Sequence, residues 1–301
     1  MTLLAARDVR VHYRVRGATL EAVRGVSLSV ARGERVGLVG ESGSGKSSLA
    51  RALLGLEPIA SGAIHFDGQA VHGAARALRR RFQPVFQDAG SALDPRMSVG
   101  ASLREPFEIH DVGTAVEREA RVDALLELVQ LPREVKERLP KTLSAGQRQR
   151  VNIARALALE PELLILDEPV SALDVSVQAQ VLNLLDGIAK ARSLTLVFIS
   201  HDLDVVAHLC SRVAVMYAGL VVEQGPTATV LEGPLHPYTR ALCAARTQPL
   251  AATPGEPPSP HRWPSGCAFH PRCPVVGPRC ATERPALADG PHRAACFVTD
   301  P

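Results

Sequence analysis

The sequence predicts an α/β protein followed by a loop-rich extension. Up to about residue 225, short apolar strands alternate with segments of helical periodicity, which is typical of α/β folds. Three of these strands end in residues suited to phosphate chemistry, and ligands bind at the carboxyl ends of strands in open parallel sheets. Beyond this body the composition changes, because 12 of the 23 prolines lie between Pro249 and Pro301.

Composition and charge exclude several classes of protein. The formal charge of +3 over 301 residues provides no electrostatic case for binding nucleic acid. The basic cluster at Arg76, Arg79, Arg80 and Arg81 is interpreted as a solvated helix face. No apolar stretch approaches the ~18 residues of a membrane span, and the N-terminus lacks a secretory core. We therefore expect a cytosolic chain that meets a membrane only through a partner.

The first strand leads into a phosphate loop. A buried strand is expected from Val36 to Val39, and a helix through about Leu54. Between them the pattern G-x-x-x-x-G-K-S fits a loop whose backbone N–H groups converge on phosphate. Lys46 adds a charge near the β and γ phosphates, and the Ser47 hydroxyl can take a Mg²⁺ position. The candidate nucleotide-binding residues are Gly40, Glu41, Ser42, Gly43, Ser44, Gly45, Lys46, Ser47 and Ser48.

The second strand, Leu163 to Leu166, is followed directly by two acidic residues. Asp167 can hold Mg²⁺ directly or through water, and Glu168 can accept a proton from an attacking water. The third strand, Leu194 to Ile199, is followed by His201, interpreted as a γ-phosphate contact. The alternatives are a helix N-cap for the acids and a capping or packing role for the histidine.

The segment "LSAGQRQR", Leu143 to Arg150, resembles half of a phosphate site. Ser144 and Gln147 form an S-x-x-Q capping box, and the helix it starts is expected to run toward Glu160. A helix start can offer backbone N–H groups to an anion. No apolar strand leads into this segment, so it cannot be a second phosphate loop.

Six motifs beside the phosphate loop occur in one order: Tyr13, Gln87 in "VFQD", "LSAGQRQR", "ILDEP", "SALD" ending at Asp174, and His201. The series resembles the nucleotide-binding subunits of ABC transporters from about Leu3 to the end of the chain. The resemblance implies a P-loop NTPase fold with a RecA-like core, an antiparallel β subdomain, and a helical signature subdomain at about 89–155. It implies an ATPase domain at 1–233 and an extension at 234–301. Within the helical subdomain, Thr114 and Glu117 predict another capping box, and Val122, Leu125 and Val129 share one face.

The resemblance also implies roles for the matched residues in an ATPase that drives transport with ATP and Mg²⁺. Two such domains dimerise head to tail, so Ser144, Gly146 and Gln147 would contact the γ-phosphate held by the partner. The remaining implied roles are adenine stacking for Tyr13, Mg²⁺ and water contact for Gln87, the catalytic carboxylate for Glu168, the dimer interface for Asp174, and Mg²⁺ ligation for Ser47, Gln87 and Asp167.

Two positions depart from the family pattern. Ala145 stands where the signature usually has glycine, and a methyl group there could crowd the partner's ATP. Val170 replaces the usual threonine after "DEP", which is a milder change. The chain's own half of the site is intact.

The segment "GPLHPYTRAL", with "HPYT" at His236 to Thr239, resembles the dipeptide, oligopeptide and nickel importers of prokaryotes. The "DPR" and "GQRQR" segments resemble those of their F-type subunit. The implied partners are a second, different ATPase, two membrane permeases and an extracytoplasmic solute-binding protein. The implied location is the cytoplasmic face of the inner membrane, as a peripheral subunit. Peptide is the expected cargo, with nickel or glutathione left open. A soluble ABC ATPase without transport and a non-catalytic module are the rival functions.

Four cysteines lie in the extension, at Cys267, Cys273, Cys280 and Cys296, separated by five, six and fifteen residues. A segment with so little apolar periodicity is expected to need a cross-link or a bound metal in order to fold. Disulfides do not suit a reducing cytosol, which leaves free thiols, Zn²⁺ or an iron–sulfur cluster. The tail resembles that of peptide-importer ATPases proposed to bind a [4Fe–4S] cluster, and we favour that reading. Cys210 and Cys243 are expected to be buried small apolar residues of the body.

Overall fold

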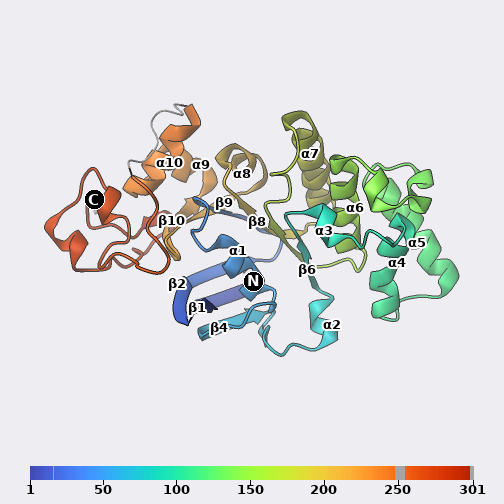
Figure 1. Cartoon of the computed structure of the whole chain (residues 1–301), viewed down its shortest axis with the longest axis horizontal. Coiled ribbons are helices and arrows are strands. Elements are labelled where there is room, and N and C mark those ends of the chain that lie inside the picture. Colours follow the sequence, from blue (N-terminus) through green and yellow to red (C-terminus); the bar gives the residue numbers. More distant parts are fainter. Residues whose placement is uncertain (16, 248–254, 299–301) are drawn as a thin grey trace. The chain divides into compact units, whose positions relative to one another are not determined.

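The computed structural model describes residues 1–15, 17–247 and 255–298. They form two compact units, each described by itself below (Figure 1). Unit one contains Met1–Gly73 and Phe198–Pro301, and unit two contains Ala74–Val197. Strand β8 (Thr195–Ser200) carries the chain from unit two back into unit one.

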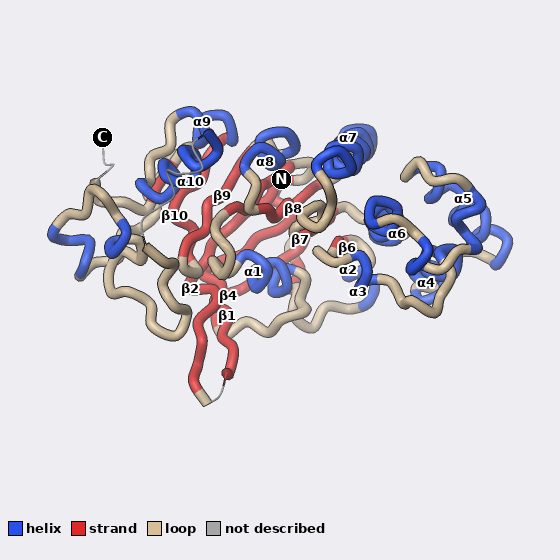
Figure 2. Tube along the Cα trace, turned by 45° about the horizontal axis from the view of Figure 1, so that its top comes forward, coloured by secondary structure: helices blue, strands red, loops and turns tan. Residues whose placement is uncertain are grey.

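Unit one contains a four-stranded antiparallel sheet in the order β2-β1-β4-β5 (Figure 2). The long strand β1 pairs with β2 on one side and with β4 on the other. Along β1 the burial alternates at several positions, as expected for a sheet with one face in a core. The expected antiparallel β subdomain is confirmed. Its strands are β1 (Thr2–Val15), β2 (Ala18–Ala31), β4 (Ser61–Phe66) and β5 (Gln69–Ala70).

A second sheet of unit one has the order β11-β10-β9-β3. Strand β3 pairs in parallel with β9, and the β9–β10 and β10–β11 pairs are antiparallel. Helix α8 packs on β3 at Gly37, where a Cβ would lie 2.3 Å from Cγ1 of Val206. The elements are β3 (Arg35–Val39), β9 (Arg212–Tyr217), β10 (Leu220–Pro226), β11 (Arg293–Ala294), α1 (Lys46–Leu53), α8 (Leu203–Leu209), α9 (Thr227–Glu232), α10 (Pro237–Thr247), and the 3-10 helices η3 (His270–Arg272) and η4 (Pro278–Ala281).

Unit two pairs two parallel strands, β6 and β7, with a group of helices. Helices α4, α5 and α6 contact one another, as Figure 1 shows for this unit. The elements are β6 (Phe82–Val85), β7 (Leu163–Asp167), α2 (Arg76–Arg79), α3 (Ala89–Ala92), α4 (Val99–Ile109), α5 (Ala115–Leu128), α6 (Ala145–Leu157), α7 (Val175–Ala191), and the 3-10 helices η1 (Arg133–Glu137) and η2 (Pro140–Thr142).

Both expected capping boxes are present in unit two. Thr114 and Glu117 exchange side-chain and backbone hydrogen bonds at the start of α5, and Ser144 and Gln147 do the same at α6. The predicted apolar face of α5 is buried. Helix α6 ends at Leu157, earlier than expected, and Glu160 adopts a positive φ of 51° that a helix cannot continue.

The basic cluster in unit two matches its interpretation at three of four positions. Arg76, Arg79 and Arg80 are exposed, whereas Arg81 is half-buried and forms an ion pair with Glu162. No helix in the described ranges has both the length and the apolar character needed to cross a membrane.

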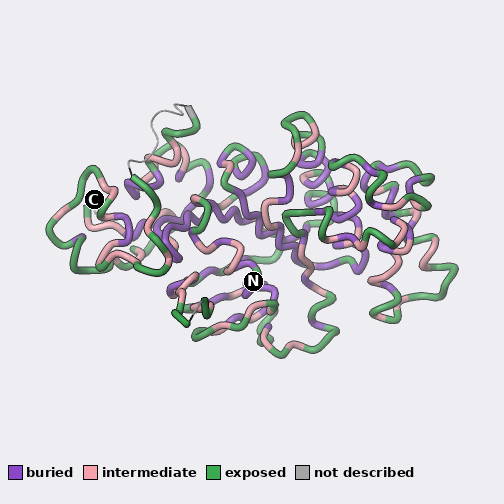
Figure 3. Tube along the Cα trace, viewed as in Figure 1, coloured by how far each residue is buried: buried purple, intermediate pink, exposed green. Residues whose placement is uncertain are grey.

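The C-terminal extension obtains its core from the body of unit one. Phe269 is 1% exposed and packs with its ring centroid 5.2 Å from Tyr217 and 5.5 Å from Tyr238. Figure 3 shows buried and half-buried stretches among the exposed parts of the extension. Burying a phenylalanine side chain contributes about 1.5–3 kcal/mol. The expectation that the tail can bury too little apolar surface is therefore incomplete, because Phe269 packs on Tyr217 of the body as well as on Tyr238 near the start of the extension.

A buried carboxylate provides a second anchor for the extension. Glu223 on β10 is fully buried and accepts hydrogen bonds from the backbone N–H groups of Leu235 and His236, both at 2.8 Å. Its Oε1 also lies 2.7 Å from Nε2 of His292, just before β11. A buried carboxylate requires several such partners, so Glu223 fixes the path of the chain on both sides of the extension.

Candidate functional site

The phosphate loop of unit one is shaped by two glycines. Gly40 follows β3 with φ 150°, and a Cβ there would lie 2.1 Å from the carbonyl oxygen of Met216. Gly45 is the N-cap of α1 with φ 99°, and its Cβ would lie 2.3 Å from the carbonyl oxygen of Ala22. Both obstacles are backbone atoms that cannot move aside. The loop therefore has room for glycine alone, as the motif predicts.

Lys46 lies inside the loop it terminates. Its Nζ donates to the carbonyl oxygens of Gly40 at 2.7 Å and Glu41 at 2.9 Å, and the residue is 4% exposed. A further contact joins Nζ to Oγ of Ser44 at 3.4 Å. The ammonium group is thus held where a phosphate entering the loop would meet it.

Glu41 is held by the C-terminal extension and the segment before it. Its backbone N–H donates to the hydroxyl oxygen of Tyr238 at 2.8 Å. Its carboxylate accepts two hydrogen bonds from the Arg272 guanidinium, at 2.9 and 3.2 Å, and Arg272 also donates to the Tyr217 hydroxyl at 3.2 Å. Burial raises the pKa of the Tyr238 hydroxyl well above its usual range, so it stays protonated. We call Tyr217, Tyr238 and Arg272 the Glu41 clamp.

Sequence reasoning missed the clamp. "HPYT" served only as a marker of a subfamily, and Arg272 was not singled out. Tyr238 and Arg272 stand 197 and 231 positions from Glu41 in the sequence, and no local pattern connects them to it.

The other two unit-one candidates lie at strand ends. His201 is exposed and directly follows β8, while the neighbouring Asp202 caps α8 by accepting from the N–H of Asp204 at 2.8 Å. The capping role that was an alternative for His201 thus belongs to Asp202. Tyr13 is half-buried near the end of β1, and its hydroxyl finds no hydrogen-bond partner among the described residues.

Unit two brings Gln87 and Glu168 together. Val85 on β6 pairs with Leu166 on β7, and each functional residue stands two positions further along its own strand direction. Nε2 of Gln87 donates to Oε2 of Glu168 at 3.2 Å, and Glu168 adopts a positive φ of 45°. Asp167 is half-buried at the end of β7. The parallel pairing of two strands is what places the two side chains in contact.

Two residues that the sequence did not indicate support this pair. Ser171 lies 3.4 Å from Nε2 of Gln87 through its Oγ, and that Oγ donates to the carbonyl oxygen of Glu168 at 3.1 Å. Asn152 on α6 donates to the carbonyl oxygen of Phe86 at 3.3 Å. The signature helix is therefore connected by a hydrogen bond to the residue before Gln87.

The signature segment begins α6 with a tight contact. Ser144 is the N-cap, accepting from the N–H of Gln147 at 3.2 Å. Gly146 is buried, and a Cβ there would lie 2.4 Å from Cγ1 of Val177 on α7. Ala145 is exposed, so its methyl group points away from this packing. The departure at Ala145 leaves the chain's own fold undisturbed.

Asp174 caps α7 in this structure. Its Oδ1 accepts from the N–H of Val177 at 3.0 Å and from the hydroxyl of Ser176 at 2.8 Å. The backbone hydrogen bond from Val177, with the Ser176 hydroxyl second, lowers the pKa of the Asp174 carboxyl. Asp174 therefore acts as the N-cap of α7, which is compatible with the dimer-interface role that the resemblance implies.

The four cysteines of the extension are neighbours. The N–H of Cys267 donates to the carbonyl oxygen of Cys280 at 2.8 Å. Burial raises the pKa of Cys267, and the thiols of Cys280, Cys296 and Cys273 raise it further. Among the described residues, no group of three or more His, Cys, Asp or Glu side chains is placed to hold a metal ion.

The two cysteines of the body behave differently from each other. Cys210 is buried, and burial raises its pKa to about 12, as expected for a small apolar core residue. Cys243 is only half-buried.

Comparisons with known proteins identify the class. Residues 23–171 match the family described as ABC transporter, and residues 222–280 match the C-terminal region of oligopeptide/dipeptide transporters. The dimeric ATP-binding cassette MJ0796 in its ADP- and phosphate-bound state superposes with a TM-score of 0.68 at 27% identity, covering 75% of this chain and 99% of that one. The cassette cbiO1 of Clostridium perfringens gives 0.67 at 28% identity, covering 83% and 96%. Fold and site together define an ATP-binding cassette.

Curated relatives cover nearly the whole chain. A peptide import ATP-binding protein of Brucella abortus is 48% identical over 97% of this chain and 91% of its own length. One of Brucella ovis is 47% identical over 98% and 97%. The chain belongs to the ABC transporter family, as an ATP-hydrolysing subunit with the oligopeptide-transporter type of C-terminal region.

The contact between α6 and α7 predicts that Gly146→Ala destabilises unit two by about 1–3 kcal/mol, because valine is stiff at χ1 and cannot easily turn away. Val177→Ala should restore most of this loss when combined with it. Gly187→Ala is the control, since no atom lies within 4 Å of its added methyl, and it should stabilise by roughly 0.5–1 kcal/mol. Urea unfolding gives the free energy of unfolding of the wild type, of Gly146→Ala, of the double variant and of Gly187→Ala. A Gly146→Ala protein as stable as wild type would refute the close approach.

The Glu41 clamp predicts that Arg272→Gln weakens binding of ADP with Mg²⁺ roughly tenfold, or about 1.4 kcal/mol. The substitution leaves the Glu41 carboxylate unneutralised beside the loop that receives phosphate. Arg272→Lys should retain part of the affinity, and the exposed Arg262→Gln should retain all of it. Calorimetric titration gives the affinity and urea unfolding gives the stability. Lower stability with unchanged affinity would mean that the clamp only holds the extension in place.

Proposed function

We propose that the chain is the ATP-binding and hydrolysing subunit of an importer for dipeptides and oligopeptides. The observation that carries this proposal is a complete set of ATPase residues in a chain that matches peptide-import relatives over nearly its full length. Nickel and glutathione import are the alternatives, and a soluble ATPase without transport is the least supported. We also propose that residues 1–233 act as the ATPase domain, with the helical subdomain at about 89–155, and residues 234–301 as the importer-type extension.

The phosphate loop fits a nucleotide. Its glycine backbone leaves space that any Cβ would fill, and the Lys46 ammonium is held inside it. The Ser47 hydroxyl, the Gln87 side-chain oxygen and the Asp167 carboxylate are oxygen ligands of the kind Mg²⁺ prefers. When bound there, Mg²⁺ would neutralise negative charge that develops on the phosphates during transfer.

Each catalytic residue then has a defined task. Glu168 accepts the proton of the attacking water, and Gln87 orients the carboxylate through the 3.2 Å hydrogen bond described above. His201 donates to a γ-phosphate oxygen, and Tyr13 stacks on the adenine ring. Positioning and charge neutralisation are what phosphoryl transfer requires.

A second ATPase subunit completes each site. In this proposal Ser144, Gly146 and Gln147 contact the γ-phosphate held by the partner subunit, and Asp174 lies at the dimer interface. ATP then joins the two subunits, and hydrolysis releases them. The dimer works on two membrane permeases, supplied by an extracytoplasmic binding protein, at the cytoplasmic face of the inner membrane.

For the extension we propose a [4Fe–4S] cluster on Cys267, Cys273, Cys280 and Cys296. Besides burial, the thiols of Cys280, Cys296 and Cys273 raise the pKa of Cys267, which supports their proximity to it. Backbone N–H groups also point at two of the sulfurs, from Gly277 to Sγ of Cys280 at 3.4 Å and from Val298 to Sγ of Cys296 at 3.5 Å. Such hydrogen bonds tune cluster thiolates. Among the described residues these thiols do not form a ligand cage, so cluster binding would require them to rearrange.

The catalytic assignment predicts that Glu168→Gln lowers ATP hydrolysis by roughly 10²–10⁴-fold, because it keeps size and hydrogen bonding but removes the base. ATP binding should persist, and ATP should trap the dimer with its partner subunit on size-exclusion chromatography. Cells carrying this variant should lose uptake of a labelled dipeptide. The exposed Glu160→Gln serves as the control. Hydrolysis at the wild-type rate would remove Glu168 from its role, and lost nickel uptake with intact dipeptide uptake would refute the cargo.

The cluster predicts that protein purified without oxygen is brown, with broad absorption near 400 nm and about four irons per chain. Cys273→Ser should abolish the colour and spare nucleotide binding, whereas Cys243→Ser should keep the colour. Colourless protein without iron or zinc by elemental analysis would rule out a metal centre.

A further inference from the structure

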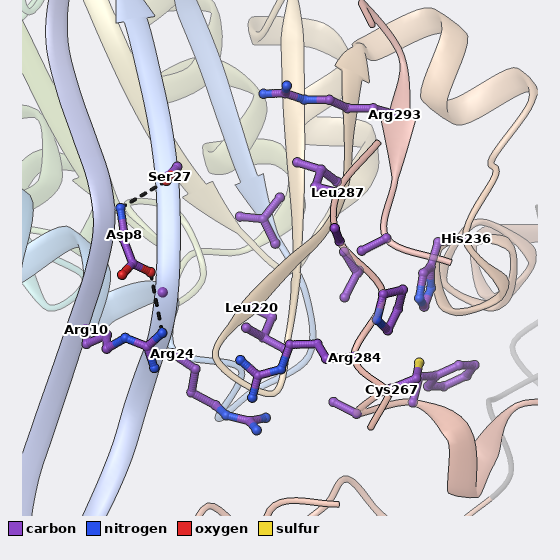
Figure 4. Close-up of a pocket in the computed structure, with 18 residues that line it drawn as sticks. Asp8, Arg10, Arg24, Ser27, Leu220, His236, Cys267, Arg284, Leu287 and Arg293 are labelled. Atoms are coloured by element: carbon purple, nitrogen blue, oxygen red, sulfur yellow. Dashed lines mark hydrogen bonds and ion pairs between the residues drawn. The ribbon is translucent and has the colours of Figure 1, made fainter. Parts of the chain in front are cut away.

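Unit one contains a cavity of about 370 Å³ away from the phosphate loop (Figure 4). The strands β1, β2 and β10 line it together with the extension. None of its lining residues belongs to the ATPase motifs. Its volume is within the range of small-molecule sites, whose walls are mainly apolar with a few polar groups that fix orientation.

The most buried charge of the cavity is Arg24 on β2. The residue is 5% exposed, and its Nη1 donates to the carbonyl oxygen of Ala218 at 3.2 Å. Among the described residues its Nε has no hydrogen-bond partner, and the Glu21 carboxylate oxygen lies 3.9 Å away. A buried guanidinium donor without a partner costs free energy that an incoming acceptor recovers.

Other guanidinium groups surround this donor. Burial lowers the pKa of Arg24 to about 10, and the charge of Arg284 is the next cause, with Arg10 contributing less and Glu21 opposing. In Figure 4, Arg284 from the extension extends toward the same region as Arg24. Arg10 is paired with Asp8 at 3.5 Å, and among the lining residues that the structure describes Asp8 is the single acidic one beside four arginines. The field inside the cavity is therefore positive.

The remaining walls are apolar. Leu220 and Val222 on β10 line it, and Phe269 and Leu287 from the extension complete the wall. At Gly25, a Cβ would lie 2.5 Å from Oδ1 of Asp8 and 3.1 Å from Nη2 of Arg10, so this position leaves space for the polar groups. The cavity thus has a cationic end and an apolar wall.

We propose that this cavity binds a small organic anion, with a carboxylate or phosphate group on Arg24 and Arg284 and an apolar body against Leu287 and Phe269. Guanidinium forks bind either head group bidentately. The site is separate from the nucleotide site proposed above, so its failure leaves that proposal standing.

The test titrates phenyl phosphate and phenylacetate, in separate experiments, into the full chain saturated with ADP and Mg²⁺, which occupies the phosphate loop. Calorimetry should give saturable binding of at least one probe with a dissociation constant below about 1 mM. Inorganic phosphate, which lacks an apolar body, should bind at least about tenfold more weakly than phenyl phosphate if phosphate is the preferred head group.

Arg284→Gln should weaken probe binding at least about tenfold. Arg279→Gln is the matched control, because Arg279 is exposed and paired with Glu283 in the same part of the extension. Leu287→Trp should also weaken binding, by filling the apolar wall without removing charge. Thermal unfolding confirms that each variant is folded. No binding of either probe up to about 10 mM, or equal binding by Arg284→Gln and wild type, would overturn the proposal.

Discussion

The close approach of backbone to backbone around the phosphate loop is the constraint on which unit one depends. The hydrogen bond from the N–H of Gly219 to the carbonyl oxygen of Ser44, at 3.0 Å, adds a third tie to the contacts at Gly40 and Gly45. Backbone atoms of strand β2, strand β9 and the β9–β10 turn surround the loop and restrict its conformation. Its shape is therefore set by segments far away in sequence.

The extension is attached to the same loop. Glu41 stands inside the phosphate motif, and the clamp holds both its backbone and its carboxylate. Arg272 directly precedes Cys273, and Phe269 belongs both to the aromatic cluster of the clamp and to a wall of the arginine-lined cavity. Only one or two side chains therefore separate the cysteines and the cavity from the phosphate loop.

Local features could be predicted from the sequence, and contacts between distant segments could not. The phosphate loop and the capping boxes at Thr114 and Ser144 depend on spacings of a few residues, so their patterns are visible. No periodic pattern in the sequence indicates the contacts between distant residues. Examples are Glu41 with Tyr238, Gly146 with Val177 and Gln87 with Ser171. The supposed need for a cross-link arose for the same reason, because sequence does not show that Phe269 packs on Tyr217 of the body and on Tyr238 near the start of the extension.

Asp174 and the signature residues proposed to contact a partner subunit also stabilise the fold of their own chain. Ser144 caps α6, Gly146 makes room for Val177, and Asp174 caps α7. The hydrogen bonds that fix these helix starts are intramolecular, so little conformational freedom remains to be lost when a partner's nucleotide arrives. The lowered pKa of Asp174 also means that its cap contributes stability above the carboxyl's unfolded pKa and loses it only as pH falls through the folded value. At neutral pH the cap is therefore fully ionised, and both helix starts are preorganised by the fold itself.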